Sequence, residues 1–425
     1  MPYMEELVVQ TVLTLATQVW GYDALGSPEL AIGCKSLPEG PTTTTTRLLG
    51  SRTASGLWEF TLPPRPAGMV CDLEVTDGSE DIVLTDIMHG DIWLCSGQSN
   101  MEQSMGNIMN ATEEIAASTS FTTIRYTVVQ NAVSATPDPD MDVPLQQPWA
   151  DSSDSAALSG MSAVCFLFAR SLQQEWASLG QPAVPLGLVD SDWGGTPLEA
   201  WAPPGSLDTC GAGADCCGCS EDYPNHCPSR LYNAMVGPLT RLSIQGFLWY
   251  QGEANINMNN NRDLYNCTFP ALIDSWRQEF SGHSATAPDA PFGFVQLASW
   301  RPDSLDAGFP VIRWHQTADM GYVPNTRMER VFMASPLDTY NAKEGYPGNI
   351  HTRYKQIVGE RLALAGLHVA YGESAYRPYG PSLRKSHLRR INRRSQSLTT
   401  TALSSTTQKY PASMPATWSR GGVTT

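Results

Sequence analysis

Hydrophobic and polar residues alternate along the first part of the chain, in short runs that glycine, proline and aspartate interrupt. The runs cover residues 8–22, 56–64 and 69–90. A period of two is typical of β-strands that bury one face. We therefore predict an N-terminal β module of the β-sandwich type over residues 1–88, with a loop at the threonine run 42–46.

The pattern changes near residue 90, where apolar runs begin to alternate with segments of helical period. The predicted strands with their turns cover residues 91–97, 185–195, 243–255 and 291–299, and the predicted helices cover residues 160–176, 230–242, 264–280 and 351–366. Strands that alternate with helices predict an α/β domain, in which a parallel sheet carries helices on both faces. We expect this domain to span residues 89–373.

The last part of the chain, residues 374–425, is poor in large apolar residues and rich in serine and threonine. Such a segment buries too little apolar surface to fold, so we predict a disordered tail. The tail carries nine Lys and Arg residues and no Asp or Glu. An alternative interpretation of residues 384–394 is a nuclear-localisation or nucleic-acid-binding patch.

The net charge is unevenly distributed. The 425 residues carry a formal charge of −15, but the first 373 carry 18 basic and 42 acidic side chains, a balance of −24. An acidic body disfavours nucleic acid as a partner. The apolar fraction of 41% is that of a soluble globular protein. No apolar run reaches the roughly 18 residues of a membrane-spanning helix.

Five of the ten cysteines lie between Cys210 and Cys227. Their spacing lacks the paired C-x-x-C units of zinc ribbons, so a disulfide-tied loop in an oxidising compartment fits better than a metal site. Two N-x-[ST] sequons, at Asn110 and Asn266, agree with a secretory route. Residues 1–21 carry two early acids and no basic region, which is unlike a signal peptide.

Three of the predicted strands end in glycine-rich polar turns, at residues 97–100, 192–196 and 251–255. The reactive groups of open α/β sheets gather at the carboxyl ends of the strands. Ser99 lies in the first turn, and a serine on a sharp strand-to-helix turn presents its hydroxyl and its own N–H together. Met101 stands where a G-x-S-x-G turn has its second glycine. A nucleophile and an ordinary polar loop are therefore both open interpretations.

A serine nucleophile needs a neighbouring base, which is most often histidine. His351 follows a loop of glycine and proline at the predicted start of a helix, where an imidazole can reach over the strand ends. His315, in an aromatic and polar segment, competes with it for this role. His368 lies in a predicted late strand and fits the core.

The chain contains seven motifs in order, namely DIWLCSGQSNM, DWGGTPLEAW, FLWYQGEANI, NCTFPALIDSW, FGFVQLAS, IRWHQTADMGYVPN and IHTRYKQIVGERLA. Together they resemble the sialate O-acetylesterases, a family of the SGNH-hydrolase superfamily, over about residues 8–373. The resemblance implies a flavodoxin-like three-layer α/β hydrolase domain flanked by β modules. It implies hydrolysis of O-acetyl esters, with 9-O-acetyl sialic acid as substrate, in a lysosomal or secreted protein without metal or cofactor.

The positions of these motifs also assign residues. The resemblance implies that Ser99 is the nucleophile and that His351 is the general base. It implies an oxyanion hole formed by N–H groups of Ser99, Gly194, Gly195 and Gln251. The side chain of Gln251 is the implied donor there, and Glu253 and Asn255 are alternatives to it.

The sequence departs from the family around the base. Many SGNH enzymes place an orienting acid three residues before the histidine, where this chain has Gly348. Asp338 is the candidate for the acid, and Asn349 or a backbone carbonyl are alternatives. The acid holds the imidazole and does not react, so a Ser–His dyad is also workable.

Substrate contacts follow from the carboxylate of sialic acid, which arginine or lysine binds well. Arg313 and Lys355 lie near the motifs and are the candidates, with a surface ion pair as the alternative role of each. Two other functions stay open for the chain. One is another carbohydrate acetylesterase, such as the acetyl-xylan type, and the other is a catalytically inactive glycan-binding protein.

Overall fold

The computed structural model describes residues 8–10, 17–21, 28–36, 43–52, 57–76, 81–137, 144–212, 218–256, 261–300, 308–339 and 350–376. The predicted tail lies outside the described residues, apart from its first three positions. Its predicted disorder therefore stays a prediction.

A sheet of seven consecutive strands forms the centre of the α/β domain, in the order β10-β9-β11-β8-β12-β13-β14. The strands are β8 (Asp81–Gly97), β9 (Ile124–Val129), β10 (Leu145–Asp151), β11 (Leu186–Asp192), β12 (Gly246–Tyr250), β13 (Phe292–Val295) and β14 (Val331–Ala334). Every neighbouring pair in this path is parallel except β10 with β9. Strands β11, β12 and β13 are buried along their whole length, as expected where helices cover both faces. The predicted α/β class is confirmed.

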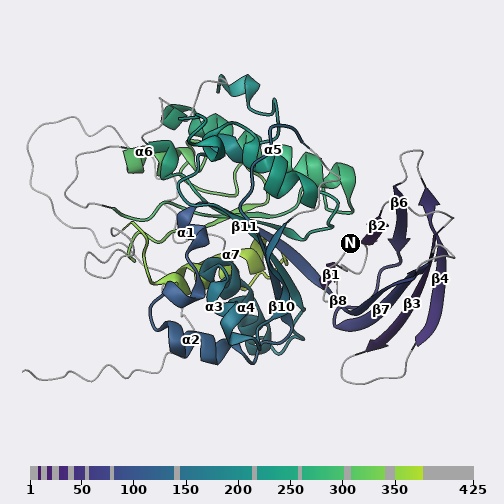
Figure 1. The fold of residues 1–425 in the computed structure, drawn as a ribbon. Helices are drawn as coiled ribbons and strands as arrows, with labels where there is room; N and C mark the ends of the chain where they lie inside the picture. Colours follow the sequence, from purple (N-terminus) through teal and green to yellow (C-terminus); the bar gives the residue numbers. More distant parts are fainter. Residues whose placement is uncertain are drawn as a thin grey trace, which may run out of the picture. The chain divides into compact units, whose positions relative to one another are not determined.

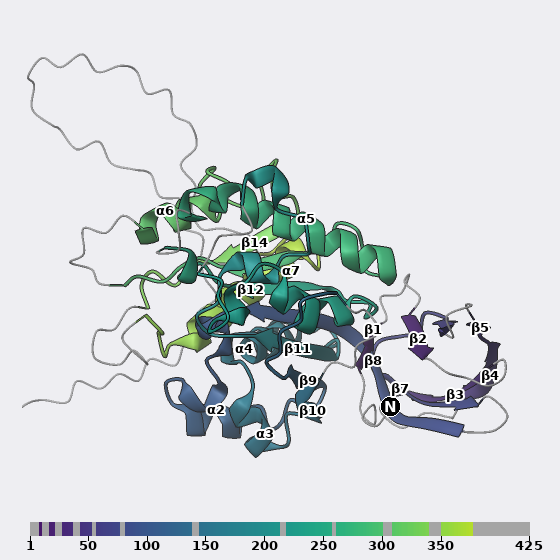
Figure 2. The same ribbon diagram turned by 45° about the horizontal axis from the view of Figure 1, so that its top comes forward.

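Seven α-helices accompany these strands in the described residues (Figure 1): α1 (Ser99–Glu102), α2 (Ala111–Ser118), α3 (Ser155–Gly160), α4 (Ala163–Ser178), α5 (Tyr265–His283), α6 (Gly308–His315) and α7 (Lys355–Val369). In both ribbon views α5 lies over one face of the sheet, while α4 and α7 pack together on the other (Figure 2). Of the helices described, none is both long and apolar enough to cross a bilayer.

The N-terminal strands are β1 (Val8–Gln10), β2 (Thr17–Gly21), β3 (Glu29–Ser36), β4 (Thr43–Leu49), β5 (Ser51–Arg52), β6 (Trp58–Leu62) and β7 (Met69–Thr76). Antiparallel pairs join β4 to β3, β3 to β7 and β7 to β8, while β2, β6 and β5 form a separate small sheet. Leu30, Ile32, Phe60 and Leu73 belong to a hydrophobic core of their own. This agrees with a β module at the N-terminus.

Strand β8 is shared by the two parts of the fold. Its first half pairs with β7, and its second half pairs with β11 and β12. The predicted boundary between residues 88 and 89 therefore falls inside one continuous strand. The division into domains at residues 1–88, 89–373 and 374–425 stays a prediction.

Three local predictions are wrong. The threonine run lies largely in β4 and not in a loop, because β-branched threonines fit a strand that pairs with β3. Residues 230–242 form a π-helical turn and a 3₁₀ turn, since Pro238 lacks the N–H that a regular helix needs. His368 lies in α7 and not in a strand.

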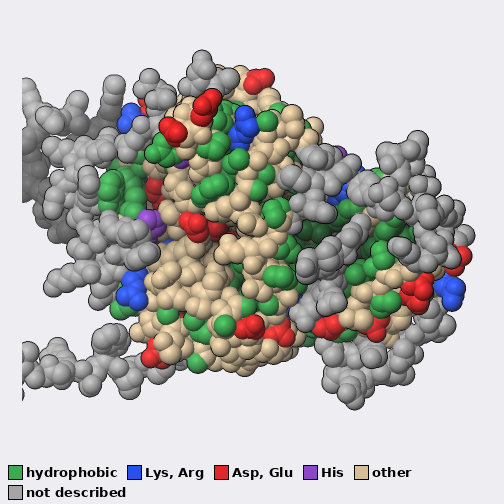
Figure 3. Space-filling model, viewed as in Figure 1, with side chains coloured by type: hydrophobic (Ala, Val, Ile, Leu, Met, Phe, Trp, Pro, Cys, Tyr) green, Lys and Arg blue, Asp and Glu red, His purple; other side chains and the backbone are tan. Residues whose placement is uncertain are grey.

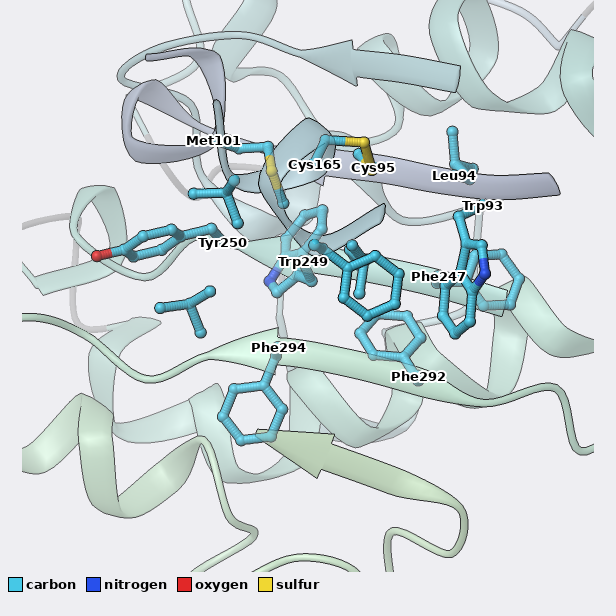
Figure 4. Close-up of a cluster of buried hydrophobic side chains, with 14 of the residues drawn as sticks. Trp93, Leu94, Cys95, Met101, Cys165, Phe247, Trp249, Tyr250, Phe292 and Phe294 are labelled. Atoms are coloured by element: carbon cyan, nitrogen blue, oxygen red, sulfur yellow. A yellow bond between two sulfur atoms is a disulfide. The ribbon is translucent and has the colours of Figure 1, made fainter. Parts of the chain in front are cut away.

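Aromatic side chains fill the core beside β8, β12 and β13. Figure 4 shows Trp93, Phe247, Trp249, Phe292 and Phe294 around these strands, and all five are buried. The rings of Phe247 and Phe292 lie 5.5 Å apart between centroids, within the range of favourable aromatic pairs. Truncating such a ring to alanine costs about 3–5 kcal/mol. The strands that carry the polar turns thus have a rigid base.

The described cysteines form four disulfides: Cys34–Cys71, Cys95–Cys165, Cys210–Cys267 and Cys219–Cys227. The second one ties β8 to α4 directly beneath the first polar turn (Figure 4). Disulfides, as predicted for the cysteine-rich segment, engage Cys210, Cys219 and Cys227. The other two cysteines of that segment, at positions 216 and 217, lie outside the described residues.

Candidate active site

The three polar turns meet at one edge of the sheet. β11, β8 and β12 are neighbours and run parallel, so their carboxyl ends lie side by side. In the register of the sheet, Gly97 at the end of β8 is paired with Asp192 of β11 and with Tyr250 of β12. The sequence therefore predicted correctly where the polar turns gather.

Gly97 allows these turns to approach closely. A Cβ at this position would lie 2.2 Å from the carbonyl oxygen of Tyr250, and the backbone has a φ of +141°. Gln98 donates its N–H to the same carbonyl at 3.0 Å, and Trp193 donates its N–H to the Gly97 carbonyl at 3.2 Å. The side chain of Gln98 accepts the N–H of Ala254 at 3.1 Å. One turn is thus bonded to both of its neighbours.

Ser99 and His351 are brought together from opposite ends of the domain. The Nε2 of His351 lies 2.7 Å from the Oγ of Ser99, a hydrogen-bond distance, and both residues are half-buried. Ser99 is the first residue of α1, so its hydroxyl and N–H stand at the end of the sheet.

Figure 3 shows acidic side chains spread over one face of the molecule, with few basic ones.

The segment that carries His351 is fixed by its neighbours. Thr352 donates its hydroxyl to the Thr339 carbonyl at 2.8 Å, and Arg353 donates through Nη2 to the Ile108 carbonyl at 2.9 Å. Met109 donates its N–H to the Arg353 carbonyl at 2.8 Å. Helix α7 begins four residues later than the histidine, so the prediction that His351 opens the helix is wrong. The imidazole is held by a loop and not by a helix.

The two glycines after β11 lie beside the serine. A Cβ on Gly194 would be 3.3 Å from the Cβ of Ser99 and 2.5 Å from Oε2 of Glu102, so a larger residue would have to displace the Glu102 carboxylate. Gly194 donates its N–H to the Glu102 carboxylate. Gly195 is exposed and has a φ of +78°. The N–H of Gly194 is therefore already engaged.

Gln251 is turned away from the serine. Its Nε2 donates to the Thr196 carbonyl at 3.1 Å and to Oδ1 of Asn255 at 2.6 Å, and its Oε1 accepts the hydroxyl of Tyr265 at 2.9 Å. The residue is fully buried. An amide has two N–H donors, and both are used here. The geometry thus argues against Gln251 as a side-chain donor to an oxyanion.

Asn255 and Glu199 complete this network. Asn255 accepts the N–H of Leu198 at 3.0 Å and donates to Glu199 at 2.9 and 3.2 Å. Asn261 also donates to Glu199, at 2.9 Å. The carboxylate is buried, and burial raises its pKa. The alternative role of Asn255 as an oxyanion donor therefore also conflicts with its contacts.

A second buried network lies directly under Ser99, and sequence reasoning missed it. Asn100 donates to Oε1 of Glu253 at 2.6 Å and to the carbonyl of Ile350 at 3.1 Å, and it accepts from Nζ of Lys355 at 2.6 Å. Asn100 and Lys355 are fully buried. The signal for this network in the sequence is that a polar residue, Asn100, directly follows Ser99 at the end of a buried strand.

The charges of this network are shifted toward neutrality. Burial lowers the pKa of Lys355 to about 7, against the opposing effect of Glu253. Burial also raises the pKa of Glu253, and the bond from Asn100 and the charge of Lys355 oppose that rise. Lys355 also lies 5.0 Å from the centre of the Tyr250 ring. Lys355 has no exposed surface, which argues against its predicted role as a substrate ligand.

Two further predicted residues are placed elsewhere. Both carboxylate oxygens of Asp338 accept from Arg361, at 2.6 and 2.7 Å, and the side chain of Asp338 is 63% exposed. The structure does not bring Asp338 to His351, which argues against an orienting role. Arg313 donates to the carbonyls of Leu297 and Ala298 at 3.5 and 3.2 Å, and its contacts are those of a structural residue.

The competing histidine has a different partner. His315 lies 2.5 Å from Asp319 through Nδ1, in an ion-pair geometry at the end of α6. Among the described histidines, it is His351 that meets Ser99.

Two more buried carboxylates lie below the glycine turn. Asp190 and Asp192 of β11 share a hydrogen bond, and Asp190 also accepts the N–H of Ser162 at 3.0 Å. Burial raises the pKa of Asp190 to about 6 and the pKa of Asp192 well above its usual value. Asp190 adds to the rise at Asp192, whereas the contact with Asp192 opposes the rise at Asp190. The charge of Glu102 raises both pKa values. The pair therefore holds a proton more tightly than free aspartates do.

One cluster of potential metal ligands lies on β3, β7 and β8. Within the described ranges, one group of three potential ligands lies close together, formed by Cys34, Cys71 and His89. Its two sulfur atoms form a disulfide, and Nε2 of His89 lies 3.1 Å from the sulfur of Cys71. Disulfide sulfurs are not thiolates, so this group does not have the donor set of a zinc site.

A serine hydroxyl bonded to an imidazole, at the carboxyl edge of a parallel sheet, is the arrangement of a hydrolase with a serine nucleophile. Comparison with known proteins narrows this class. Residues 89–344 match the family model described as carbohydrate esterase, sialic acid-specific acetylesterase. The chain belongs to this family, and it is a carboxylic ester hydrolase.

Similar proteins extend the match beyond the family model. The chain is 38% identical to the sialate O-acetylesterase of Homo sapiens and 35% identical to that of Mus musculus. These alignments cover 87% of this chain and 70% and 73% of the relatives. Among solved structures, a carbohydrate acetylesterase from Xanthomonas citri aligns with a TM-score of 0.69 and 28% identity, over 88% of this chain and 75% of that one.

Proposed function

We propose that this protein removes O-acetyl groups from sialic acids, with the 9-O-acetyl ester as its substrate, by a serine-esterase mechanism. The contact of 2.7 Å between Ser99 and His351 carries the proposal. The family description and the names of the mammalian relatives support the acetyl ester and the sialic acid as substrate.

In the first half of the reaction, Oγ of Ser99 attacks the acetyl carbonyl while Nε2 of His351 takes the hydroxyl proton. The tetrahedral intermediate then collapses, and its bond to the sugar oxygen breaks. His351 gives the proton to that oxygen, and the deacetylated sugar leaves. In the second half, His351 takes a proton from water, the water attacks the acetyl-enzyme, and acetate is released as Ser99 recovers its proton.

The negative charge on the tetrahedral intermediate needs N–H donors. We assign the N–H groups of Ser99 and Gly195 to this role. Ser99 stands at the first turn of α1, where backbone N–H groups have no partner within the helix. Gly195 is exposed beside it, whereas the N–H of Gly194 is bonded to Glu102. Removing one such donor commonly costs a factor of about 10²–10³ in rate.

In this proposal Asp338 does not orient the imidazole of His351. The bidentate ion pair of Asp338 with Arg361 supports this assignment. The alternative Asn349 lies outside the described residues. A backbone carbonyl is sufficient to hold an imidazole tautomer, because the orienting group does not itself react.

We also propose the finer fold that the family resemblance implies, a flavodoxin-like three-layer hydrolase domain. Without the additional strand β9, the order of the parallel strands β11-β8-β12-β13-β14 corresponds to 2-1-3-4-5. The positions of α5 on one face and of α4 and α7 on the other support it. In such folds the ligand binds outside the carboxyl ends of the strands, where Ser99 lies.

A lysosomal or secreted location is likewise proposed. Four disulfides among the described cysteines are typical of proteins that fold in an oxidising compartment.

The test is acetate release from a 9-O-acetyl sialoside by the purified protein. Ser99→Ala should lower the rate by about 10³-fold or more, because the acyl acceptor is lost. Ser120→Ala, at an exposed serine, is the matched control and should keep the wild-type rate. Equal rates in wild type and Ser99→Ala would remove Ser99 from the mechanism.

A second candidate is an acetylesterase for other carbohydrates, which the structural match to the Xanthomonas citri enzyme favours. A panel of acetylated sialosides and acetylated xylan separates the two substrates. A fluorophosphonate probe tests whether the serine is reactive at all. Failure to label Ser99 in folded protein would favour a glycan-binding role over catalysis.

A further inference from the structure

The side chain of Asn100 connects the two backbone segments that carry the reacting pair. Asn100 directly follows Ser99, and its Nδ2 donates to the carbonyl of Ile350, which directly precedes His351. The two bonded residues, Asn100 and Ile350, are 250 positions apart in the sequence. A single amide therefore links the chain beside the hydroxyl to the chain beside the imidazole.

Two charged side chains determine which way this amide faces. In its ammonium form Lys355 has only N–H donors, so it requires the oxygen of Asn100 on its side, at 2.6 Å. The Glu253 carboxylate has only acceptors, so it requires the nitrogen, also at 2.6 Å. The second hydrogen of that nitrogen then points to Ile350. With the amide reversed, Nδ2 would face an ammonium group and Oδ1 would face a carboxylate and a carbonyl.

Most of this network is buried, and Glu253 is partly exposed. Asn100 and Lys355 have no exposed surface, and the groups that face Lys355 are Asn100 from α1, Glu253 from the turn after β12 and the Tyr250 ring from β12. Buried hydrogen bonds in such surroundings are stronger than exposed ones, and an unpaired partner is costly. Buried charges of opposite sign are weak evidence for stability alone, so the position of Lys355 and Glu253 on either side of the Asn100 amide needs another explanation.

We propose that Lys355 and Glu253 are positioning residues, which act through Asn100 to keep the Ser99 hydroxyl within hydrogen-bond reach of His351. This role rests on the proposed serine-esterase function. Neither residue touches the substrate. Lys355 and Glu253 fix the orientation of the Asn100 amide. This amide in turn fixes the distance between the segments that carry Ser99 and His351.

The test uses the full chain with Lys355→Met, Glu253→Gln, Glu253→Ala and the double variant Lys355→Met/Glu253→Gln. Lys355→Met should lower kcat by about 100-fold with KM within about 2-fold, the effect expected when reacting groups are misplaced by about 1 Å. Glu253→Gln keeps an acceptor oxygen and should stay within about 3-fold of wild type, while Glu253→Ala should lose at least about 10-fold. Gln181→Ala, at an exposed amide, is the control.

The double variant distinguishes a loss of positioning from the effect of leaving a buried charge without a counter-charge. Lys355→Met alone leaves the carboxylate of Glu253 buried without a counter-charge, and Glu253→Gln removes that charge. The double variant should therefore recover about 10-fold in kcat over Lys355→Met. Thermal unfolding is followed in parallel. If Lys355→Met does not fold, the Glu253→Gln and Glu253→Ala pair decides, because glutamine should rescue what alanine loses.

The rate of Ser99 labelling by a fluorophosphonate is measured in every variant, because labelling needs no sialoside. Wild type that labels but releases no acetate would refute the substrate and leave the positioning role testable. The positioning role is refuted if the variants lower only the unfolding temperature, if KM rises as kcat stays constant, or if the double variant recovers the wild-type kcat.

Discussion

Two buried networks support the same three turns, and each joins an asparagine to a glutamate. In one, Glu253 faces Asn100 and Lys355, and the asparagine also holds the backbone beside His351. In the other, Glu199 is held by amides alone. The first network touches the reacting segments and contains a cation. The second ties one turn to another and does not include the reacting pair.

The difference shows how a buried carboxylate can serve two purposes. Amide donors satisfy Glu199 without a counter-charge, and the result is a stable scaffold for the turn after β12. The charge of Lys355 also fixes how the Asn100 amide is oriented, because an ammonium group accepts only the amide oxygen as its neighbour. We therefore expect damage to the second network to reduce stability, and damage to the first to reduce turnover.

The largest effect is expected from Asn255→Ala. This change leaves the Leu198 N–H and one amide hydrogen of Gln251 unpaired, and it removes two donors from Glu199. Losing buried partners of this kind costs about 3–5 kcal/mol. Denaturant unfolding should show a lower free energy of unfolding, with kcat per folded molecule near wild type. A large loss of kcat at unchanged stability would contradict the scaffold role.

Asn100→Ala should have the opposite profile. The bonds to Ile350, Glu253 and Lys355 are all lost, so the two reacting segments are no longer linked by this side chain. We expect kcat to fall about 100-fold, equivalent to about 2.7 kcal/mol of activation free energy. Steady-state kinetics at saturating substrate measures this. Wild-type kcat in the variant would show that the link is dispensable.

The third prediction concerns buried acids that lack a cation. The raised pKa values of Asp190 and Asp192 mean that the folded state binds protons that the unfolded state has released. Their stabilising contribution is complete below about pH 4 and is lost as pH rises through about 6 and beyond. Asp192→Asn should therefore be more stable than wild type at pH 7.5, by about 1–2 kcal/mol, with the gap closing as pH falls to about 4.

Measuring the difference between variant and wild type is essential here. Burial lowers the pKa of His89 to about 4, so His89 contributes stability that grows as pH rises between about 4 and 6.5. That contribution is common to both proteins and cancels in the difference. Parallel pH profiles for the two proteins would show that the Asp190–Asp192 pair is not linked to stability.

The smallest effect is expected from Asp338→Asn. Its ion pair with Arg361 is largely exposed, and such pairs contribute about 0–1 kcal/mol. Because the side chain does not contact His351, kcat should stay within about 2-fold of wild type. A drop of 100-fold or more in kcat would restore Asp338 as the orienting acid.

The sequence was informative where a local pattern determines the structure. Apolar runs ending in glycine-rich turns located the ends of β8, β11 and β12, and the alternation of strands with helices indicated the α/β class. The threonine run shows the limit of such patterns, because β4 forms by pairing with β3. Likewise the sequence did not reveal that β8 continues across the predicted domain boundary.

Ser99 and His351 were recognised as candidates from their local settings and from the family motifs, whereas their partners depended on the tertiary structure. Gln251, Asp338 and Lys355 each have a side chain suited to the predicted role. Their hydrogen bonds go instead to Asn255, Arg361 and Asn100. A side chain bonds to whatever lies within about 3 Å, and the sequence alone does not specify that distance between remote segments.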